Sequence, residues 1–267
     1  MVQLSNQRKG SDHMEPILLA ERLQKTYGGR GRETAALRDL SLAVEPGEFV
    51  GIMGPSGSGK TTLLNCLSTI DRPTGGRIVI DGREVTAMKP REISAFRREK
   101  LGFIFQDGNL LDTLTAFENI ALALTILRRP AGEIEGLVTG TAGLLGIERV
   151  LDKYPYQLSG GERQRVAAAR AIITDPALVM ADEPTGALDS KSSRQLLDRL
   201  EALNRERGAT ILMVTHDPFT ASYCHRILFL RDGSLCRQLE RREEDRRGFF
   251  GRIMDVMTEL GGGADVL

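Results

Sequence analysis

The sequence of 267 residues predicts an α/β protein built around a mainly parallel β-sheet. Short apolar runs alternate with segments of helical periodicity, which is the pattern of buried parallel strands covered by helices. The clearest run, residues 49–53, stops at Gly54, where a glycine-rich loop leads into a helix. The longest nearly apolar run, residues 120–127, is far shorter than the about 20 residues that a membrane-spanning helix needs.

Apolar patterning and turn residues place the individual elements. The expected strands lie at residues 17–19, 36–44, 49–53, 77–80, 177–181 and 210–214. The expected helices lie at residues 61–68, 114–127, 143–150 and 159–173. Because residues from about 107 to 174 show no strand pattern, we expect a helical insertion within the α/β core.

Charge and cysteine content exclude some classes of protein. The 36 Lys and Arg residues equal the 36 Asp and Glu residues, so the formal net charge is zero. That balance argues against a chain that coats nucleic-acid phosphates, and we expect no nucleic-acid partner. Cys66, Cys224 and Cys236 lack metal-ligand spacing, which predicts reduced thiols in a cytoplasmic protein.

Three parts are expected along the chain. Residues 1–13 are polar and aperiodic and predict a flexible tail, which leaves Met14 as an alternative to Met1 as the start. Residues 14–240 form the folded domain, including the helical insertion at roughly 107–174. Residues 241–267 form a charged and amphipathic extension.

The extension carries an apolar stripe at helical spacing, which predicts a helix with one buried face. Docking of that stripe on its own domain is one interpretation, and contact with a membrane partner or membrane surface is the other. The stripe consists of Phe250, Ile253, Met254, Met257 and Leu260.

The glycine-rich loop from Gly54 to Thr61 fits G-x-x-x-x-G-K-[ST] and lies between an expected strand and an expected helix. Glycines let backbone N–H groups wrap closely around phosphate oxygens, and the start of the helix adds its positive dipole end. Lys60 would reach the β- and γ-phosphates, and the Thr61 hydroxyl would hold Mg²⁺. The loop predicts a nucleoside triphosphate site formed by Gly54, Ser56, Gly57, Ser58, Gly59, Lys60, Thr61 and Thr62.

An acidic pair, Asp182-Glu183, follows the expected strand at 177–181. Ligands bind at the carboxyl ends of strands in α/β sheets, and adjacent residues there point in different directions. We therefore expect Asp182 to orient Mg²⁺ and Glu183 to act as the general base toward water. A helix-capping acidic pair is the alternative.

A second glycine motif, Ser159-Gly160-Gly161-Glu162, opens an expected helix. Ser159 and Glu162 have the spacing of a capping box. A cap does not need two glycines between its partners, and bare N–H groups at a helix start can approach an anion closely. The motif therefore predicts a second phosphate-binding surface, which a second copy of the chain could bring to the first.

These motifs resemble those of the ATP-binding subunits of ABC transporters, over nearly the whole chain. The resemblance implies a P-loop NTPase core of the RecA-like type, with an N-terminal antiparallel β subdomain and an inserted helical subdomain. It implies that Tyr27 stacks on adenine, that Gln106 contacts Mg²⁺ and water, and that His216 contacts the γ-phosphate. It further implies that the loop ending at Asp189 crosses a dimer interface.

The same resemblance implies partners. Two copies would pair head to tail, with ATP between the phosphate loop of one and Ser159–Gly161 of the other. The pair would sit at the inner face of the cell membrane and drive a permease, with Gln106 linking the site to that partner.

Three segments, residues 105–114, 215–224 and 249–256, are most similar to ATPases of the bacitracin type, which confer resistance to antimicrobial peptides. Such systems also imply a sensor kinase reached through the permease. ATPases of macrolide-export or lipoprotein-release systems are the alternative, and a soluble ABC ATPase of iron–sulfur assembly is a further one. Gly108 departs from the pattern, because a bulky residue is expected there beside the groove for the permease.

Overall fold

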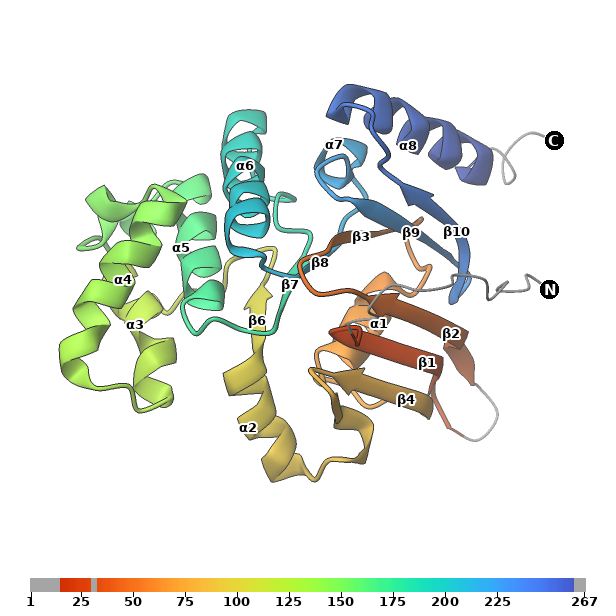
Figure 1. Ribbon diagram of the computed structural model, residues 1–267, viewed down its shortest axis with the longest axis horizontal. Helices are drawn as coiled ribbons and strands as arrows, with labels where there is room; N and C mark the ends of the chain where they lie inside the picture. Colours follow the sequence, from red (N-terminus) through yellow and green to blue (C-terminus); the bar gives the residue numbers. More distant parts are fainter. Residues whose placement is uncertain (1–14, 30–32, 262–267) are drawn as a thin grey trace.

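The computed structural model describes residues 15–29 and 33–261. The expected tail at residues 1–13 and the alternative start at Met14 lie outside these residues. Two β-sheets lie side by side, one mainly parallel and one antiparallel, and a group of helices extends beyond the parallel sheet (Figure 1). The predicted α/β class is confirmed.

The six-stranded sheet has the order β10-β9-β3-β8-β7-β6, and only β10 runs antiparallel to its neighbour. Strand β3 lies between β8 and β9, so the loop after β3 leaves from the middle of the sheet. The strands are β3 (Phe49–Met53), β6 (Leu101–Ile104), β7 (Leu178–Asp182), β8 (Ile211–Val214), β9 (Arg226–Arg231) and β10 (Ser234–Glu240).

The antiparallel sheet has the order β2-β1-β4-β5. Buried residues alternate with exposed ones along β1, as expected for a sheet with one face in the core. The strands are β1 (Leu18–Tyr27), β2 (Thr34–Val44), β4 (Gly75–Ile80) and β5 (Arg83–Glu84).

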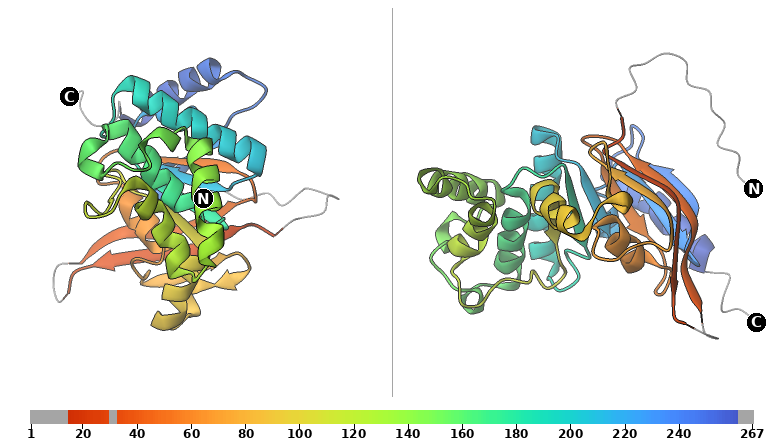
Figure 2. Two further views of the ribbon diagram at one scale, coloured as in Figure 1. Left: turned by 90° about the vertical axis from the view of Figure 1, so that its left-hand side faces the viewer. Right: turned by 90° about the horizontal axis from the view of Figure 1, so that it is seen from below.

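Helices α3, α4 and α5 form a body at one end of the molecule, opposite the antiparallel sheet (Figure 2). Residues 107–174 contain no strand, in line with the expected helical insertion. The α-helices are α1 (Lys60–Leu67), α2 (Pro90–Lys100), α3 (Ala116–Ile126), α4 (Ala131–Leu145), α5 (Gly160–Ile172), α6 (Ser190–Arg207), α7 (Pro218–Ala221) and α8 (Arg246–Gly261). Short 3-10 helices span Val85–Ala87, Glu148–Val150 and Pro155–Gln157.

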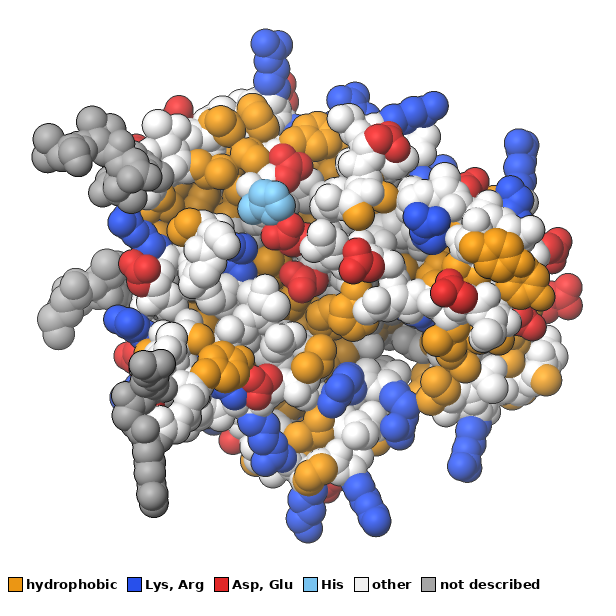
Figure 3. All heavy atoms as spheres, turned by 180° about the vertical axis from the view of Figure 1, so that it is seen from behind, with side chains coloured by type: hydrophobic (Ala, Val, Ile, Leu, Met, Phe, Trp, Pro, Cys, Tyr) orange, Lys and Arg blue, Asp and Glu red, His pale blue; other side chains and the backbone are white. Residues whose placement is uncertain are grey.

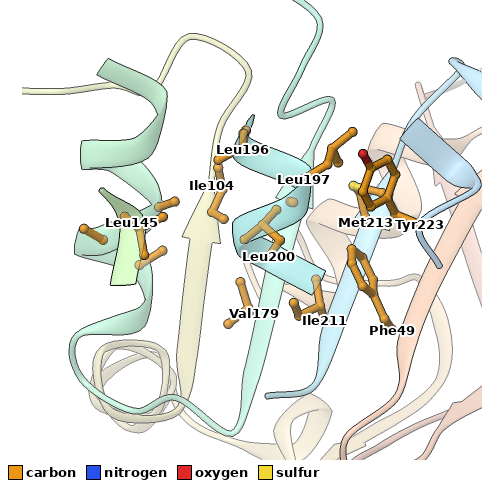
Figure 4. Packing of buried hydrophobic residues seen from close by; sticks show 14 of the residues in the cluster. Phe49, Ile104, Leu145, Val179, Leu196, Leu197, Leu200, Ile211, Met213 and Tyr223 are labelled. Carbon is orange, nitrogen blue, oxygen red and sulfur yellow. The ribbon is translucent and has the colours of Figure 1, made fainter. Parts of the chain in front are cut away.

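The hydrophobic core has two parts, one on each face of the parallel sheet. Along β7, Val179 belongs to the cluster shared with α6, and Met180 belongs to the cluster between the two sheets. Figure 4 shows Leu196, Leu197 and Leu200 of α6 packed toward the sheet. Because both faces are covered, β3, β7 and β8 carry continuous apolar runs, which made these three strands visible in the sequence.

Several element predictions were incomplete or wrong. The helix expected at 143–150 is instead α4, which ends at Leu145, with Gly146 at φ 64° after it. Four glycines within α4 hide its helical pattern in the sequence. Strands β6, β9 and β10 and helices α2 and α6 were not predicted, and β1 continues to Tyr27 rather than ending at residue 19.

Helix α8 packs on its own domain, as the first interpretation of the apolar stripe proposed. Its buried residues are Phe249, Ile253 and Val256, whereas Met254 is 41% exposed. The buried face is therefore rotated from the predicted one. The Arg246 guanidinium lies 4.0 Å from the centroid of the Tyr223 ring and adds a cation–π contact.

Among the described residues, no helix is long and apolar enough to cross a membrane.

Candidate active site

Two glycines of the loop between β3 and α1 stand where a side chain would collide with neighbouring backbone. A Cβ added to Gly54 would lie 2.1 Å from the carbonyl oxygen of Leu230, and one added to Gly59 would lie 2.6 Å from that of Ala36. Gly59 also has φ 101° and directly precedes α1. The predicted strand–loop–helix unit is therefore present, with the helix start facing the loop.

Lys60 is folded back across this loop. Its Nζ donates hydrogen bonds to the carbonyl oxygens of Gly54 at 2.8 Å and Pro55 at 2.9 Å. Burial lowers the pKa of the Lys60 ammonium, while the nearby Glu183 and Asp182 carboxylates act in the opposite direction. The ammonium thus lies in the loop and within the field of the acidic pair.

The loop borders a pocket of about 740 Å³. The Ser58 hydroxyl is buried beside it and has no hydrogen-bond partner. A buried polar group without a partner is costly, and Ser58 lies within the loop but is not among the residues that line the pocket. The pocket is lined by Ala36, Met53, Gly54, Pro55, Ser56, Gly57, Gly59, Lys60, Thr61, Thr62, Glu183, His216, Phe229, Met257 and Leu260.

The predicted acid pair lies at the end of β7. Burial raises the pKa of Asp182, and the neighbouring Glu183 charge raises it further. Glu183 has φ 45°, which turns its side chain away from the line of the strand. His216, just after β8, places Nδ1 2.7 Å from Oε2 of Glu183. The structure thus brings Glu183 and His216 together beside the phosphate loop.

Gln106 lies in the loop after β6 and is exposed. It does not line the pocket, but it approaches the turn that follows Glu183, since a Cβ added to Gly186 would lie 3.1 Å from Nε2 of Gln106. The side-chain amide of Gln106 therefore lies next to the loop that follows Asp182 and Glu183.

Ser159 caps α5, as the spacing of Ser159 and Glu162 predicted. Its Oγ accepts a hydrogen bond from Glu162 N at 3.2 Å, and Oε2 of Glu162 accepts one from Ser159 N at 2.8 Å. A Cβ at Gly161 would lie 2.7 Å from the Ser192 hydroxyl, so close packing against α6 explains this glycine. A Cβ at Gly160 would meet nothing closer than 3.6 Å, so packing does not explain that one.

Residues 159–161 do not line the phosphate pocket. They stand at the start of α5, in the helical part of the molecule, whereas α1 packs between the two sheets (Figure 1). A single chain therefore does not bring its two glycine motifs together.

Asp189 caps α6, and Tyr27 is the last residue of β1, an inner strand of the antiparallel sheet. Oδ1 of Asp189 accepts hydrogen bonds from Lys191 N and Ser192 N, both at 2.9 Å. These bonds lower the pKa of the Asp189 carboxyl, the Ser192 backbone bond most of all. Tyr27 is 42% exposed and also lies outside the pocket lining.

Gly108 has a local reason to be glycine. Its φ is 70°, and the Arg170 guanidinium donates to its carbonyl oxygen at 2.8 Å. A bulky side chain here would need a left-handed backbone, which costs about 1–2 kcal/mol. The departure from the expected pattern is therefore a turn requirement.

Some pocket residues were missed by the sequence reasoning. Phe229 was missed because β9 itself was not predicted, and no motif marks Ala36 as a neighbour of the loop. Met257 and Leu260 were expected on a packing face of the C-terminal helix, and they line the pocket as well.

Fold and site together define a nucleoside triphosphatase of the P-loop class. A family model described as ABC transporter matches residues 37–186. The bacitracin export ATP-binding protein BceA of Halalkalibacterium halodurans is 50% identical over 246 residues, covering 92% of this chain and 97% of that protein. YxdL, an ABC transporter ATP-binding protein of Bacillus subtilis, is 49% identical over 254 residues, with 95% and 98% covered.

A solved structure agrees with these relatives. The cassette MJ0796, in a dimeric post-hydrolysis state bound to ADP and Pi, superimposes with a TM-score of 0.78 at 39% identity. The match covers 85% of this chain and 100% of that one. The chain therefore belongs to the ABC transporter family, as one of its ATP-hydrolysing subunits, and the predicted resemblance is confirmed.

Proposed function

We propose that the pocket beside the phosphate loop binds ATP and that Glu183 activates the water that hydrolyses it. The observation that carries this proposal is the contact of Glu183 with His216 at the same pocket as Lys60. The attacking water gives its proton to Glu183 as its oxygen bonds to the γ-phosphorus, and the bond from that phosphorus to the ADP oxygen breaks. Lys60 and the backbone N–H groups of the loop hold the phosphates, and His216 contacts the γ-phosphate.

The residues present also fit Mg²⁺. This cation takes one or two protein oxygen ligands and completes its shell with phosphates and water. Thr61 and Asp182 supply a hydroxyl and a carboxylate next to the loop, and the raised pKa of Asp182 indicates an acid that a cation would stabilise as the carboxylate. Bound Mg²⁺ would neutralise charge on the β- and γ-phosphates, with Gln106 contributing from the neighbouring loop.

The complete catalytic site needs a second copy of the chain. The start of α5 is capped yet keeps Gly160, which packing does not require, and it lies away from its own phosphate loop. A head-to-tail pair would place Ser159, Gly160 and Gly161 of one copy on the ATP of the other, with Asp189 at the interface. The dimeric MJ0796 structure with ADP and Pi supports this arrangement.

The transport function we propose is export or removal of antimicrobial peptides of the bacitracin type, driven through a membrane permease. BceA, whose name states bacitracin export, supports it, because it aligns over nearly its whole length. The chain would then bind a permease at the inner face of the cell membrane, and a sensor kinase could contact that permease. On the face in Figure 3, acidic and basic side chains are interspersed with apolar patches, and basic side chains predominate along its lower edge.

Macrolide export is the second candidate function. The macrolide export protein MacB of Syntrophobacter fumaroxidans is 46% identical over 213 residues, and the match covers 79% of this chain but only 30% of that protein. Its cassette is part of a longer chain that includes a permease, which this chain does not match.

Co-purification from detergent-solubilised membranes tests the choice. Recovery of a large permease with one big external domain, together with bacitracin sensitivity after deletion of the ATPase gene, is the expected result. A four-span permease would favour macrolide export or lipoprotein release. Recovery of soluble partners alone would contradict a transport role and leave the ATPase in place.

A further inference from the structure

The Tyr27 hydroxyl is hydrogen-bonded to Asp71, a residue outside β1. The hydroxyl donates this hydrogen bond to Oδ2 of Asp71 at 2.8 Å. Asp71 lies between α1 and β4, so this bond joins the end of β1 to the segment that follows the phosphate-loop helix. A hydrogen bond to a carboxylate is stronger than one between neutral groups.

Asp71 is itself fixed in place. Lys25 Nζ donates to Oδ1 of Asp71 at 2.6 Å and to the carbonyl oxygen of Arg72 at 2.7 Å. The side chains of Lys25 and Asp71 are 10% and 32% exposed, so salt screens this pair less than a surface pair. The backbone N–H of Asp71 also donates to the carbonyl oxygen of Asn65 in α1, at 3.0 Å.

The ring of Tyr27 lies next to the nucleotide pocket. The Lys25 ammonium stands over the ring, 4.8 Å from its centroid, which orders the ring further. The Thr62 side chain lines the pocket and is close enough to act on the pKa of the phenol. Tyr27 is nevertheless 42% exposed, so its ring is accessible to a ligand.

We propose that Asp71 is a positioning residue, which fixes the Tyr27 ring in the orientation that stacks on the base of the bound nucleotide. The inference rests on the proposed function, in which this pocket binds ATP, and on the contact of Tyr27 with adenine that the family resemblance implies. A ring that is free to rotate loses that freedom when it stacks, whereas a ring already held does not. Sequence reasoning identified Tyr27 from its motif, but Asp71 is visible only through the fold.

Calorimetric titration of the full chain with ADP and with inorganic pyrophosphate, both with Mg²⁺, tests this role. Tyr27→Phe keeps the ring and removes the hydroxyl, while the Asp71–Lys25 pair stays intact. We expect it to raise the Kd for ADP about two- to tenfold, the range expected when a side chain must be ordered on binding. The Kd for pyrophosphate stays unchanged, because the phosphate loop is untouched.

Asp71→Asn should have the same effect as Tyr27→Phe, and the double variant should be no weaker than either single variant. Asp39→Asn is the matched control, because it removes an exposed carboxylate from the same sheet. It should leave both ligands' Kd values unchanged. A loss of pyrophosphate affinity that matches the loss for ADP would indicate a general structural role for Asp71 and overturn the proposal.

Tyr27→Ala distinguishes the contact of the Tyr27 ring with the base from the positioning role of Asp71. If Tyr27→Ala weakens ADP binding and Tyr27→Phe does not, the ring stacks without the hydrogen bond, and the positioning role of Asp71 is wrong. If Tyr27→Ala leaves ADP binding unchanged, Tyr27 does not contact the base, and the contact that the family resemblance implies fails as well, while the proposed ATP hydrolysis stands.

Discussion

Nδ1 of His216 lies 2.7 Å from Oε2 of Glu183, at the edge of the phosphate pocket. Glu183 follows β7 and His216 follows β8, and these strands are parallel neighbours. The sheet therefore delivers both side chains to one point from positions far apart in sequence. The contact fixes one carboxylate oxygen of Glu183, and in the proposed mechanism the other oxygen would face the attacking water.

Replacing Glu183 by glutamine should separate binding from hydrolysis. The amide keeps the size and the hydrogen bond but cannot accept a proton, so we expect hydrolysis to fall about 10²–10⁴-fold. Binding of ATP should persist because Lys60 and the loop are unchanged. Phosphate release and nucleotide binding are measured side by side, with the exposed Glu206→Gln as the control. Hydrolysis at the wild-type rate would show that Glu183 is not the base.

Replacing Ser159 by arginine should stop hydrolysis although the residue lies away from its own phosphate loop. The side chain would occupy the surface proposed for the partner's ATP, and loss of the cap costs α5 about 1 kcal/mol. Thr115→Arg is the matched control, since Thr115 and Glu118 form the same capping box on α3. Equal loss of phosphate release in both variants would indicate damage to the fold rather than to a shared site.

Mixing two inactive chains sharpens that test. A Ser159→Arg chain paired with a Lys60→Met chain places both defects in one ATP site and leaves the other site intact. Recovered phosphate release on mixing is expected from a head-to-tail pair. Activity that stays absent at every mixing ratio would contradict the proposal that one intact site, shared between two chains, suffices.

Gly108 should resist substitution even by alanine. Its φ of 70° disfavours any side chain, and the new Cβ would lie 3.2 Å from Oε1 of Gln164. We expect Gly108→Ala to lower the free energy of unfolding by about 1–2 kcal/mol. Gly136→Ala, in open space on α4, should instead raise it by about 0.5–1 kcal/mol. Denaturant titration measures both, and equal stability of the two variants would refute the turn requirement.

Much of the site could be predicted because its chemistry is local in sequence. The loop from Gly54 to Thr61 and the pair Asp182-Glu183 each follow a buried strand directly. The apolar pattern of the strand and the chemical groups of the site are therefore adjacent in the sequence. The same holds for β3, whose apolar run matches the strand residue for residue. Where a motif directly follows the strand that positions it, the sequence predicted both the strand and the site residues.

The remainder depended on contacts that no local pattern records. Helix α4 carries four glycines, and burial of Val138, Ala142 and Leu145 against its neighbours compensates for them. The link between Asp71 and Tyr27 arises because the sheet and the end of α1 meet in space. The orientation of α8 depends on which face fits the domain, and periodicity alone assigned Met254 to that face wrongly.

Asp71→Asn should destabilise the chain over a defined range of pH. The Lys25 hydrogen bond, above all, holds the pKa of Asp71 below its ordinary 3.8, so the stabilisation is present above pH 3.8 and is lost as pH falls through the folded-state value. Burial alone would lower the pKa of Lys25, but Asp71 raises it above 10.5, so stabilisation is lost as pH rises through that higher value.

The difference in unfolding free energy between wild type and Asp71→Asn should therefore be constant from about pH 5 to 9. We expect it to be about 1–2 kcal/mol there, because a half-buried charged hydrogen bond is lost. Below pH 3.8 it should shrink. Urea titrations across this range measure it, with Asp39→Asn as the exposed comparison, expected within about 0.5 kcal/mol of wild type. A difference that persists unchanged well below pH 3.8 would mean that the charge of Asp71 does not carry the contact.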